Sequence, residues 1–377
     1  MTGIAVFRDM ADRSGCRYLA RTGGAASVLG LRVTSNDIAS GRPFVSLLLP
    51  VRNETFELAE CARSIREQTY PAELTEVIVA DASDKPIKPI SLQIGTRVSI
   101  LRNERIIMAP GLNMAAQHAR GDYLAIVSAH SVLPPDYIER MVEVVGRTGA
   151  ANVGGRYVKV GRSAWGKAIA AATSSPFAVG LAAQHFASRS GRIDSAFPGF
   201  IERGAFERVG GFNPDLACNE DDEFNARLRA SGEAVWYEAS IEVTYRPRET
   251  LRGLWHQYYR YARWKVAIAR MGTGEYLRPH HFVPTVALLL AAATPALMWF
   301  SPKLAVPIPI LAAAYLAVSY AEARRLSRRQ AASVLRAWLV FPILHAAYAC
   351  GFIRGAFERG LPKERRSSPE TKTSAQS

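Results

Sequence analysis

Short apolar runs alternate with amphipathic stretches from residue 43 to residue 129. Four runs have the length and composition of buried strands: FVSLLLP (44–50), TEVIVAD (75–81), RVSILRN (97–103) and DYLAIVSA (122–129). Between them, residues 54–71 place apolar side chains on one helical face, and residues 110–121 begin with proline and end with glycine. This alternation predicts an α/β domain with a Rossmann-like, mostly parallel sheet and helices on both faces. No GxGxxG follows the first strand, so an ordinary dinucleotide-binding fold is disfavoured.

The C-terminal third carries long apolar segments instead. Three of them contain no charged residue: 283–300, 304–320 and 338–353. A membrane-spanning helix needs about 20 apolar residues, with a range of roughly 17–25. The first two segments qualify with their flanks and the third is short, so we expect two or three membrane helices within residues 283–353. The alternative is buried core helices of a soluble domain.

Three further regions complete the predicted organisation. Residues 1–42 show weak periodicity and are expected to form an N-terminal extension, without the long apolar stretch of a signal peptide. Residues 251–282 are aromatic and basic, which predicts an amphipathic helix in the membrane interface, an active-site segment, or both on different faces. Residues 354–377 predict a basic disordered tail. The four arginines of residues 321–330 indicate a cytosolic loop, which would place the 43–250 domain in the cytosol.

Charge and cysteine content narrow the function further. The chain of 377 residues has a net charge of +14, which is compatible with nucleic acid, an anionic membrane surface or phosphate-bearing ligands. It shows no helix-turn-helix pattern, zinc-ligand spacing or RNA-recognition signature, so we expect no nucleic-acid partner. The four cysteines form no CxxC pair and predict neither a metal site nor a disulfide framework.

Polar clusters follow the predicted strands, where ligands of open α/β sheets bind. LPVRNE (49–54) ends the first strand, Asp81 ends the second, and VSAHSVLPPDYI (127–138) follows the fourth. A carboxylate such as Asp81 can accept hydrogen bonds from a base or a ribose, or it can cap a turn of its own loop. Later in the chain, Glu220, Asp221 and Asp222 are consecutive, and a charged helix N-terminus would explain them equally well.

Taken in order, these motifs resemble family 2 glycosyltransferases of the GT-A fold. The residues that carry the resemblance are LPVRNE, IVADASD, GLNMAAQHARGDYLAIVSAH, FERVGGFNPDLACNEDDEFNARLR and QYYRYARWK. SSPFAVG (174–180) and HSVLPPDYI add a similarity to succinoglycan-type glucosyltransferases, which build bacterial exopolysaccharides on a lipid carrier. The resemblance spans about residues 43–285 and continues into the C-terminal apolar segments.

The resemblance implies roles for particular residues. The resemblance implies that three parts of the chain form the donor nucleotide site. They are the loop with Pro50, Arg52, Asn53 and Glu54, the uridine-binding Asp81, and a turn with Gly111 and Asn113. Asp221, paired with Glu220, matches the catalytic base. The Gln-x-x-Arg-aromatic motif of the family is matched by Gln257, Arg260 and Tyr261. The resemblance implies that these residues contact the diphosphate or the acceptor. Membrane anchoring is the alternative for Arg260 and an interfacial aromatic belt the alternative for Tyr261.

The metal-binding motif of the family is altered here. Family members usually have Asp-x-Asp, and the exopolysaccharide branch has Asp-Ala-His, where a metal bridges the donor phosphates. This chain has Ser128-Ala129-His130. His130 keeps a ligand for Mn²⁺, whereas the Ser128 hydroxyl is a poor ligand for a hard cation such as Mg²⁺. The alternative is a polar strand end that binds no metal.

The sequence therefore predicts a membrane-bound, inverting glycosyltransferase. The resemblance implies UDP-glucose as donor, a Mn or Mg ion as cofactor, and a lipid-linked saccharide as acceptor in extracellular polysaccharide synthesis. It also implies contact with membrane lipids at the bacterial inner membrane, with the catalytic domain facing the cytoplasm. The alternative is a non-catalytic scaffold that binds nucleotide sugar or lipid carrier, motivated by Ser128.

Overall fold

The computed structural model describes most of the chain from residue 41 to residue 362. The described ranges are 41–53, 56–88, 92, 94–180, 188–272, 277–301, 303 and 306–362. Glu54, nearly all of the predicted N-terminal extension and most of the predicted basic tail lie outside them. All described residues belong to one compact unit, residues 33–377.

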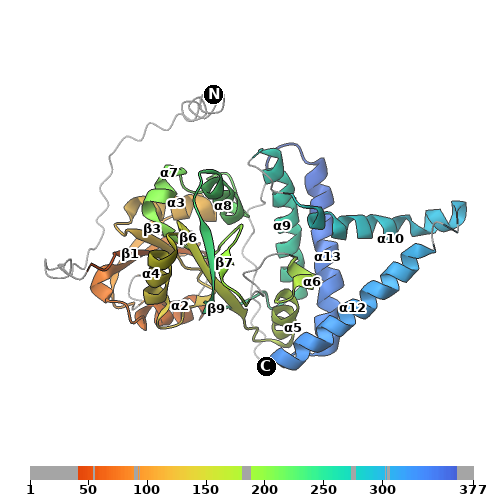
Figure 1. The fold of residues 1–377 in the computed structure, drawn as a ribbon, viewed down its shortest axis with the longest axis horizontal. Helices are drawn as coiled ribbons and strands as arrows, with labels where there is room; N and C mark the ends of the chain where they lie inside the picture. The colour runs from red at the N-terminus through yellow and green to blue at the C-terminus, as the bar shows by residue number, and fades with distance from the viewer. Residues whose placement is uncertain are drawn as a thin grey trace. The chain divides into compact units, whose positions relative to one another are not determined.

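Four parallel strands form the first half of the sheet (Figure 1). They are β1 (Val45–Val51), β2 (Thr75–Asp81), β3 (Arg97–Arg102) and β4 (Tyr123–Ile126), and their order is β3-β2-β1-β4. Every residue of β2 is buried, which explains the apolar run Val77–Ala80 at its centre. The register pairs Val51 with Asp81, so the carboxyl ends of β1 and β2 lie together.

The second half of the sheet mixes strand directions. β8 (Gly199–Glu202) runs antiparallel between β4 and β6 (Asn152–Lys159), and β9 (Val235–Tyr245) pairs in parallel with β6. The short strands β5 (Ser131–Val132) and β7 (Gly191–Arg192) pair antiparallel with β9. The sheet is thus mixed, and its parallel character is concentrated in β1 to β4.

Helices cover both faces of the sheet, as the alternating pattern predicts (Figure 1). The helices of this domain are α2 (Phe56–Arg66), α3 (Met108–His118), α4 (Tyr137–Thr148), α7 (Arg203–Arg208) and α8 (Glu220–Ala230), with a 3-10 turn η2 at Ala72–Leu74. Side chains of β1 alternate between two cores: Leu47 and Leu49 pack with α2 and α4, whereas Leu48 packs with α3 and α8. Two more helices, α5 (Ala164–Thr173) and α6 (Pro176–Val179), lead towards the C-terminal helices.

The C-terminal part consists of long helices. They are α9 (Leu251–Arg270), α10 (Val283–Phe300), α12 (Pro307–Gln330) and α13 (Val334–Phe357), with a 3-10 turn η5 at Pro279–His281. Residues 321–330, expected to be a loop, instead form the end of α12. They contain alanine, leucine, glutamate and arginine, all strong helix formers, and Glu322 pairs with Arg325 one turn later.

Two helices are long and apolar enough to cross a membrane, by length and composition alone. They are Pro279–Phe300 and Val334–Phe357. The first matches the predicted 283–300 segment, and the second extends the short 338–353 segment to a helix of 24 residues. The described part of α12 does not qualify, because its second half carries Glu322 and four arginines.

Helix α9 lies between α13 and the sheet domain (Figure 1). Trp264 and Ile268 pack against Leu216 and Cys218, and Val266 packs against Phe352 of α13. The contact with α13 is very close: a Cβ added at Gly351 would overlap the carbonyl of Tyr259. The predicted amphipathic segment is therefore packed on two sides, and its position relative to a membrane stays a prediction.

Candidate active site

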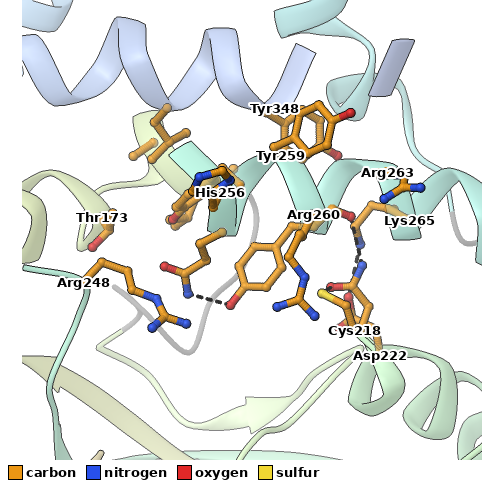
Figure 2. A pocket seen from close by; sticks show the side chains of 18 of the residues that line it. Thr173, Cys218, Asp222, Arg248, His256, Tyr259, Arg260, Arg263, Lys265 and Tyr348 are labelled. Carbon is orange, nitrogen blue, oxygen red and sulfur yellow. Dashed lines mark hydrogen bonds and ion pairs between the residues drawn. The ribbon is translucent and has the colours of Figure 1, made fainter. Parts of the chain in front are cut away.

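A cavity of about 2770 Å³ opens at the carboxyl edge of the sheet and continues along α9 to α10, α12 and α13. Nine of the residues singled out in the sequence line it: Pro50, Arg52, Ser128, His130, Glu220, Asp221, Gln257, Arg260 and Tyr261. They come from the ends of β1 and β4, the start of α8 and the middle of α9. Figure 2 shows the part of this cavity beneath α9.

Asn53 and Asp81 face their own loops and are absent from the cavity lining. The Asn53 amide group exchanges two hydrogen bonds with Asp84, each 3.0 Å long. The carboxylate of Asp81 is 1% exposed and accepts the backbone N–H groups of Ser83 at 2.8 Å and Ile87 at 3.0 Å. Asp81 thus caps the turn after β2, the alternative that the sequence left open, while Ala80 and Ala82 line the cavity beside it.

Gly111 and Asn113 do not form the expected turn, because both lie inside α3. A Cβ at Gly111 would come within 2.6 Å of Asn103, so glycine lets the helix approach β2 and β3. Asn113 donates to the carbonyl of Phe212 at 2.7 Å and accepts the Phe212 N–H at 2.9 Å. Its amide therefore holds the loop that precedes the acidic cluster, which is a supporting role.

The acidic cluster begins α8, where the helix dipole favours negative charge. Glu220 is 3% exposed, and burial raises its pKa to about 7, opposed by the nearby Arg260 guanidinium. Burial, together with the charges of Asp222 and Glu220, holds the pKa of Asp221 well above its usual range. A carboxylate with a raised pKa in a cavity is the type of group that accepts a proton near neutral pH.

Helix α9 brings the Gln-x-x-Arg-aromatic motif onto this cluster. Arg260 donates to the carbonyl of Ala217 at 3.0 Å, and Gln257 donates to the Tyr261 hydroxyl at 2.8 Å. The Tyr261 carbonyl accepts the side-chain amide of Asn219, immediately before the acids, at 3.0 Å. In Figure 2, Arg260 lies over Cys218 and Asp222. These bonds fix the position of α9 relative to the start of α8.

The residues at the altered motif do not fit a divalent metal ion. Among the described residues, no three His, Cys, Asp or Glu side chains converge to hold a metal. The hydroxyl oxygen of Ser128 accepts the backbone N–H of His130 at 3.3 Å, and it carries no charge for a hard cation. His130 lies near the positive charge of Arg248, which would repel a second cation at the same turn.

Several cationic residues of the cavity were missed in the sequence, among them Lys159, Arg248 and Lys265. Lys159 ends β6, donates to the carbonyl of Thr173 at 2.6 Å, and has a pKa lowered to about 7 by burial. Arg248 follows β9, and Lys265 on α9 pairs with Asp222 at 3.1 Å. For Lys159 the available signal was a charged residue at the end of a strand, whereas Arg248 lies three residues past the end of β9 and had no such signal.

The raised pKa values predict how transfer depends on pH. A general base must be ionised to accept a proton. The pKa values of the candidate base Asp221 and of its neighbour Glu220 are both raised, so activity should rise with increasing pH as these acids ionise. The charge of Asp222 helps to raise the pKa of both Glu220 and Asp221. We therefore expect Asp222→Asn to shift the acidic limb of the kcat profile to lower pH, measured from about pH 5 to about pH 9. An unchanged limb, or a shift to higher pH, would contradict this assignment.

The chain has relatives among known proteins. Residues 46–207 match the model of Glycosyl transferase family 2. The chain is 28% identical over 320 residues to the succinoglycan biosynthesis protein ExoA of Rhizobium meliloti (strain 1021), covering 82% of this chain and 93% of that protein. It is also 24% identical over 247 residues to a dolichyl N-acetyl-alpha-D-glucosaminyl phosphate 3-beta-D-2,3-diacetamido-2,3-dideoxy-beta-D-glucuronosyltransferase of Methanococcus voltae, covering 61% and 75%.

The fold has a solved counterpart. The mannosyltransferase PcManGT of Pyrobaculum calidifontis, solved with GDP-Man and Mn²⁺, superposes with a TM-score of 0.53 at 20% identity, covering 84% of this chain and 88% of that one. The family model ends at residue 207, before the acids of α8 and the motif of α9, whereas the match to ExoA and the superposition each cover more than four-fifths of this chain. The match over residues 46–207, the relatives and the shared fold together support a glycosyltransferase of the GT-A fold.

Proposed function

We propose that the protein transfers glucose from UDP-glucose, with inversion, to a lipid-linked saccharide during extracellular polysaccharide synthesis. The observation that carries this proposal is the two-part character of the cavity. One part is polar, with Glu220, Asp221 and Arg260, and the other is apolar, with walls from α10, α12 and α13. A donor sugar and an acceptor hydroxyl suit the first part, and a polyprenyl chain suits the second.

Asp221 is the proposed base. Its carboxylate takes the proton of the acceptor hydroxyl while that oxygen bonds to the anomeric carbon from the face opposite the diphosphate. The bond between the anomeric carbon and the diphosphate oxygen breaks, and UDP leaves with the electron pair. The anomeric carbon develops oxocarbenium character, which the adjacent carboxylates stabilise. The guanidinium of Arg260 lies at the acids and can donate to a phosphate oxygen.

The apolar lining at the far end of the cavity is compatible with a lipid-linked acceptor. Its wall there includes Ala287, Leu288, Ala291, Ile308, Leu311 and Ala312. Leu289 and Leu311 are more than half exposed, as expected of helices that face lipid. The relatives support the same class, since one is named for succinoglycan biosynthesis and another acts on a dolichyl phosphate sugar.

The proposed location is the bacterial inner membrane. Helix α10 and the apolar first half of α12 would cross it out and back, so that the arginines at the end of α12 and the catalytic domain would both lie on the cytoplasmic side. Comparison with known enzymes favours catalysis over the scaffold alternative. The substrates and the orientation are the parts that an experiment must decide.

The test uses membranes that contain the protein, a lipid extract and radiolabelled nucleotide sugars. We expect label from UDP-glucose to enter the organic phase, and we expect no such transfer with Asp221→Asn. UDP-galactose, UDP-N-acetylglucosamine and GDP-mannose serve as competing donors. Label that enters from another donor would replace the glucose assignment. Tight UDP binding without transfer from any donor would favour the scaffold instead.

A further inference from the structure

The turn at Ser128–His130 is tied to the chain segment between β9 and α9. Strand β5 pairs Ser131 with Tyr245, and the backbone N–H of Arg246 donates to the carbonyl of His130 at 2.9 Å. The rings of His130 and Tyr245 also meet edge to face, with centroids 6.5 Å apart. Any side chain just after Arg246 is therefore held close to the place where the family has its metal.

Charged neighbours of Arg248 are fixed away from the cavity. Two guanidinium nitrogens of Arg246 donate hydrogen bonds to the carboxylate of Glu60, each 3.3 Å long. Glu60 does not line the cavity. The carboxylate of Glu249 accepts the backbone N–H groups of Arg162 at 2.9 Å and Ser163 at 2.8 Å. Anchoring on both sides leaves the residue between them, Arg248, to extend into the cavity.

Arg248 offers a charged group without a carboxylate partner among the described residues. It is exposed, lines the cavity, and its guanidinium points into it in Figure 2, as does that of Arg260. Its charge lies close to the rings of His130 and Tyr245, and it adds to burial in lowering the pKa of His130.

We propose that Arg248, beside the Ser128–His130 turn, binds the donor diphosphate in place of a divalent metal ion. The inference rests on the proposed nucleoside diphosphate sugar donor. A guanidinium presents five N–H donors in a planar fork that matches phosphate oxygens, and it supplies positive charge where the turn lacks a carboxylate. Exchanging Asp for Ser at residue 128 removes a negative charge that would otherwise pair with Arg248.

Three other cations of the cavity have partners of their own. Lys265 pairs with Asp222, Lys159 donates to the carbonyl of Thr173, and Arg260 donates to the carbonyl of Ala217. Arg260 also lies at the acids, on the side where the reaction occurs. The pairing of β5 with β9 holds Arg248 beside the turn, where its charge can take the role that the metal has in the Asp-x-Asp members of the family.

The experiment measures UDP and uridine binding by calorimetry, with the full chain in detergent and EDTA present. We expect the wild-type protein to bind UDP without metal and Arg248→Gln to bind it about tenfold more weakly or worse. Uridine affinity should not change, which also reports an intact pocket. Arg97→Gln, on the exposed edge strand β3 and outside the cavity, removes the same charge and should leave both affinities unchanged.

A second variant reverses the chemistry of the site. In Ser128→Asp combined with Arg248→Gln, the turn regains a carboxylate and loses its cation, so Mn²⁺ should strengthen UDP binding at least tenfold. Equal UDP affinity in wild-type protein and Arg248→Gln would overturn the inference. Loss of wild-type UDP binding in EDTA, restored by Mn²⁺, would overturn it while leaving the proposed function intact. No binding of UDP or GDP under any condition would overturn both.

Discussion

Replacement of Asp221 by asparagine is expected to lower kcat by roughly 10³-fold, within the usual effect of removing a general base. Asparagine has the same shape and keeps the start of α8 intact, but its amide cannot take the proton of an acceptor hydroxyl. Burial and the charges of Asp222 and Glu220 raise the pKa of Asp221, which makes this carboxylate a stronger base than an exposed aspartate. Steady-state transfer to a lipid-linked acceptor measures the effect.

Two comparisons make this result specific. UDP affinity should be retained in Asp221→Asn, since the proposed donor contacts lie on other residues. Asp136→Asn is the matched control, because Asp136 precedes α4, is half-exposed, and does not line the cavity. It should transfer at the wild-type rate. If Asp221→Asn turns over as fast as wild-type protein, another residue is the base.

The first half of the fold was predictable because the local sequence of each element indicates whether it is a strand or a helix. Strands β1 and β2 are buried on both faces, so each is centred on a short apolar run, and Pro71 marks the end of the connection from the first helix. The strand directions beyond β4 were not predictable. Strand β8 joins the sheet antiparallel, and its register depends on partners far away in the sequence.

Polar residues at strand ends were easier to find than to orient. Asp81 was singled out correctly as a residue at the sheet edge, but its two oxygens accept backbone N–H groups of its own loop. Sequence cannot distinguish this from ligand binding, because both uses need the same carboxylate at the same position. Gly111 and Asn113 were misplaced for a related reason, since α3 starts earlier, at Met108.

Arg248 illustrates what only tertiary structure supplies. Nothing local in RPRET (246–250) distinguishes it from Arg246, yet Arg246 pairs with Glu60 and Arg248 enters the cavity. The difference arises from the pairing of β5 with β9, which brings the segment to His130. The meaning of Ser128, ambiguous in the sequence, depends on this contact.

The close packing of α9 on α13 leads to the second large effect, expected for Gly351→Ala. A methyl group there overlaps the Tyr259 carbonyl, so the two helices must separate. Overpacking of this kind costs about 1–3 kcal/mol of stability. Tyr259 directly precedes Arg260, so the motif on α9 moves with it, and a displacement of about 1 Å can cost about 100-fold in rate. Thermal unfolding and kcat, both in detergent, measure the two consequences.

Gly146→Ala is the control that separates helix propensity from packing. Gly146 lies inside α4, and a Cβ there would meet nothing within 4 Å, so alanine should stabilise the helix by up to about 1 kcal/mol and leave kcat unchanged. In contrast, Gly351→Ala should lower the stability of the protein and should also lower kcat. If Gly351→Ala keeps the wild-type stability and the wild-type kcat, α9 does not depend on α13 for its position, and the apolar helix only anchors the enzyme. If Gly351→Ala lowers both stability and kcat, α13 positions Arg260 against the acids of α8, and the membrane-facing part of the chain belongs to the active site.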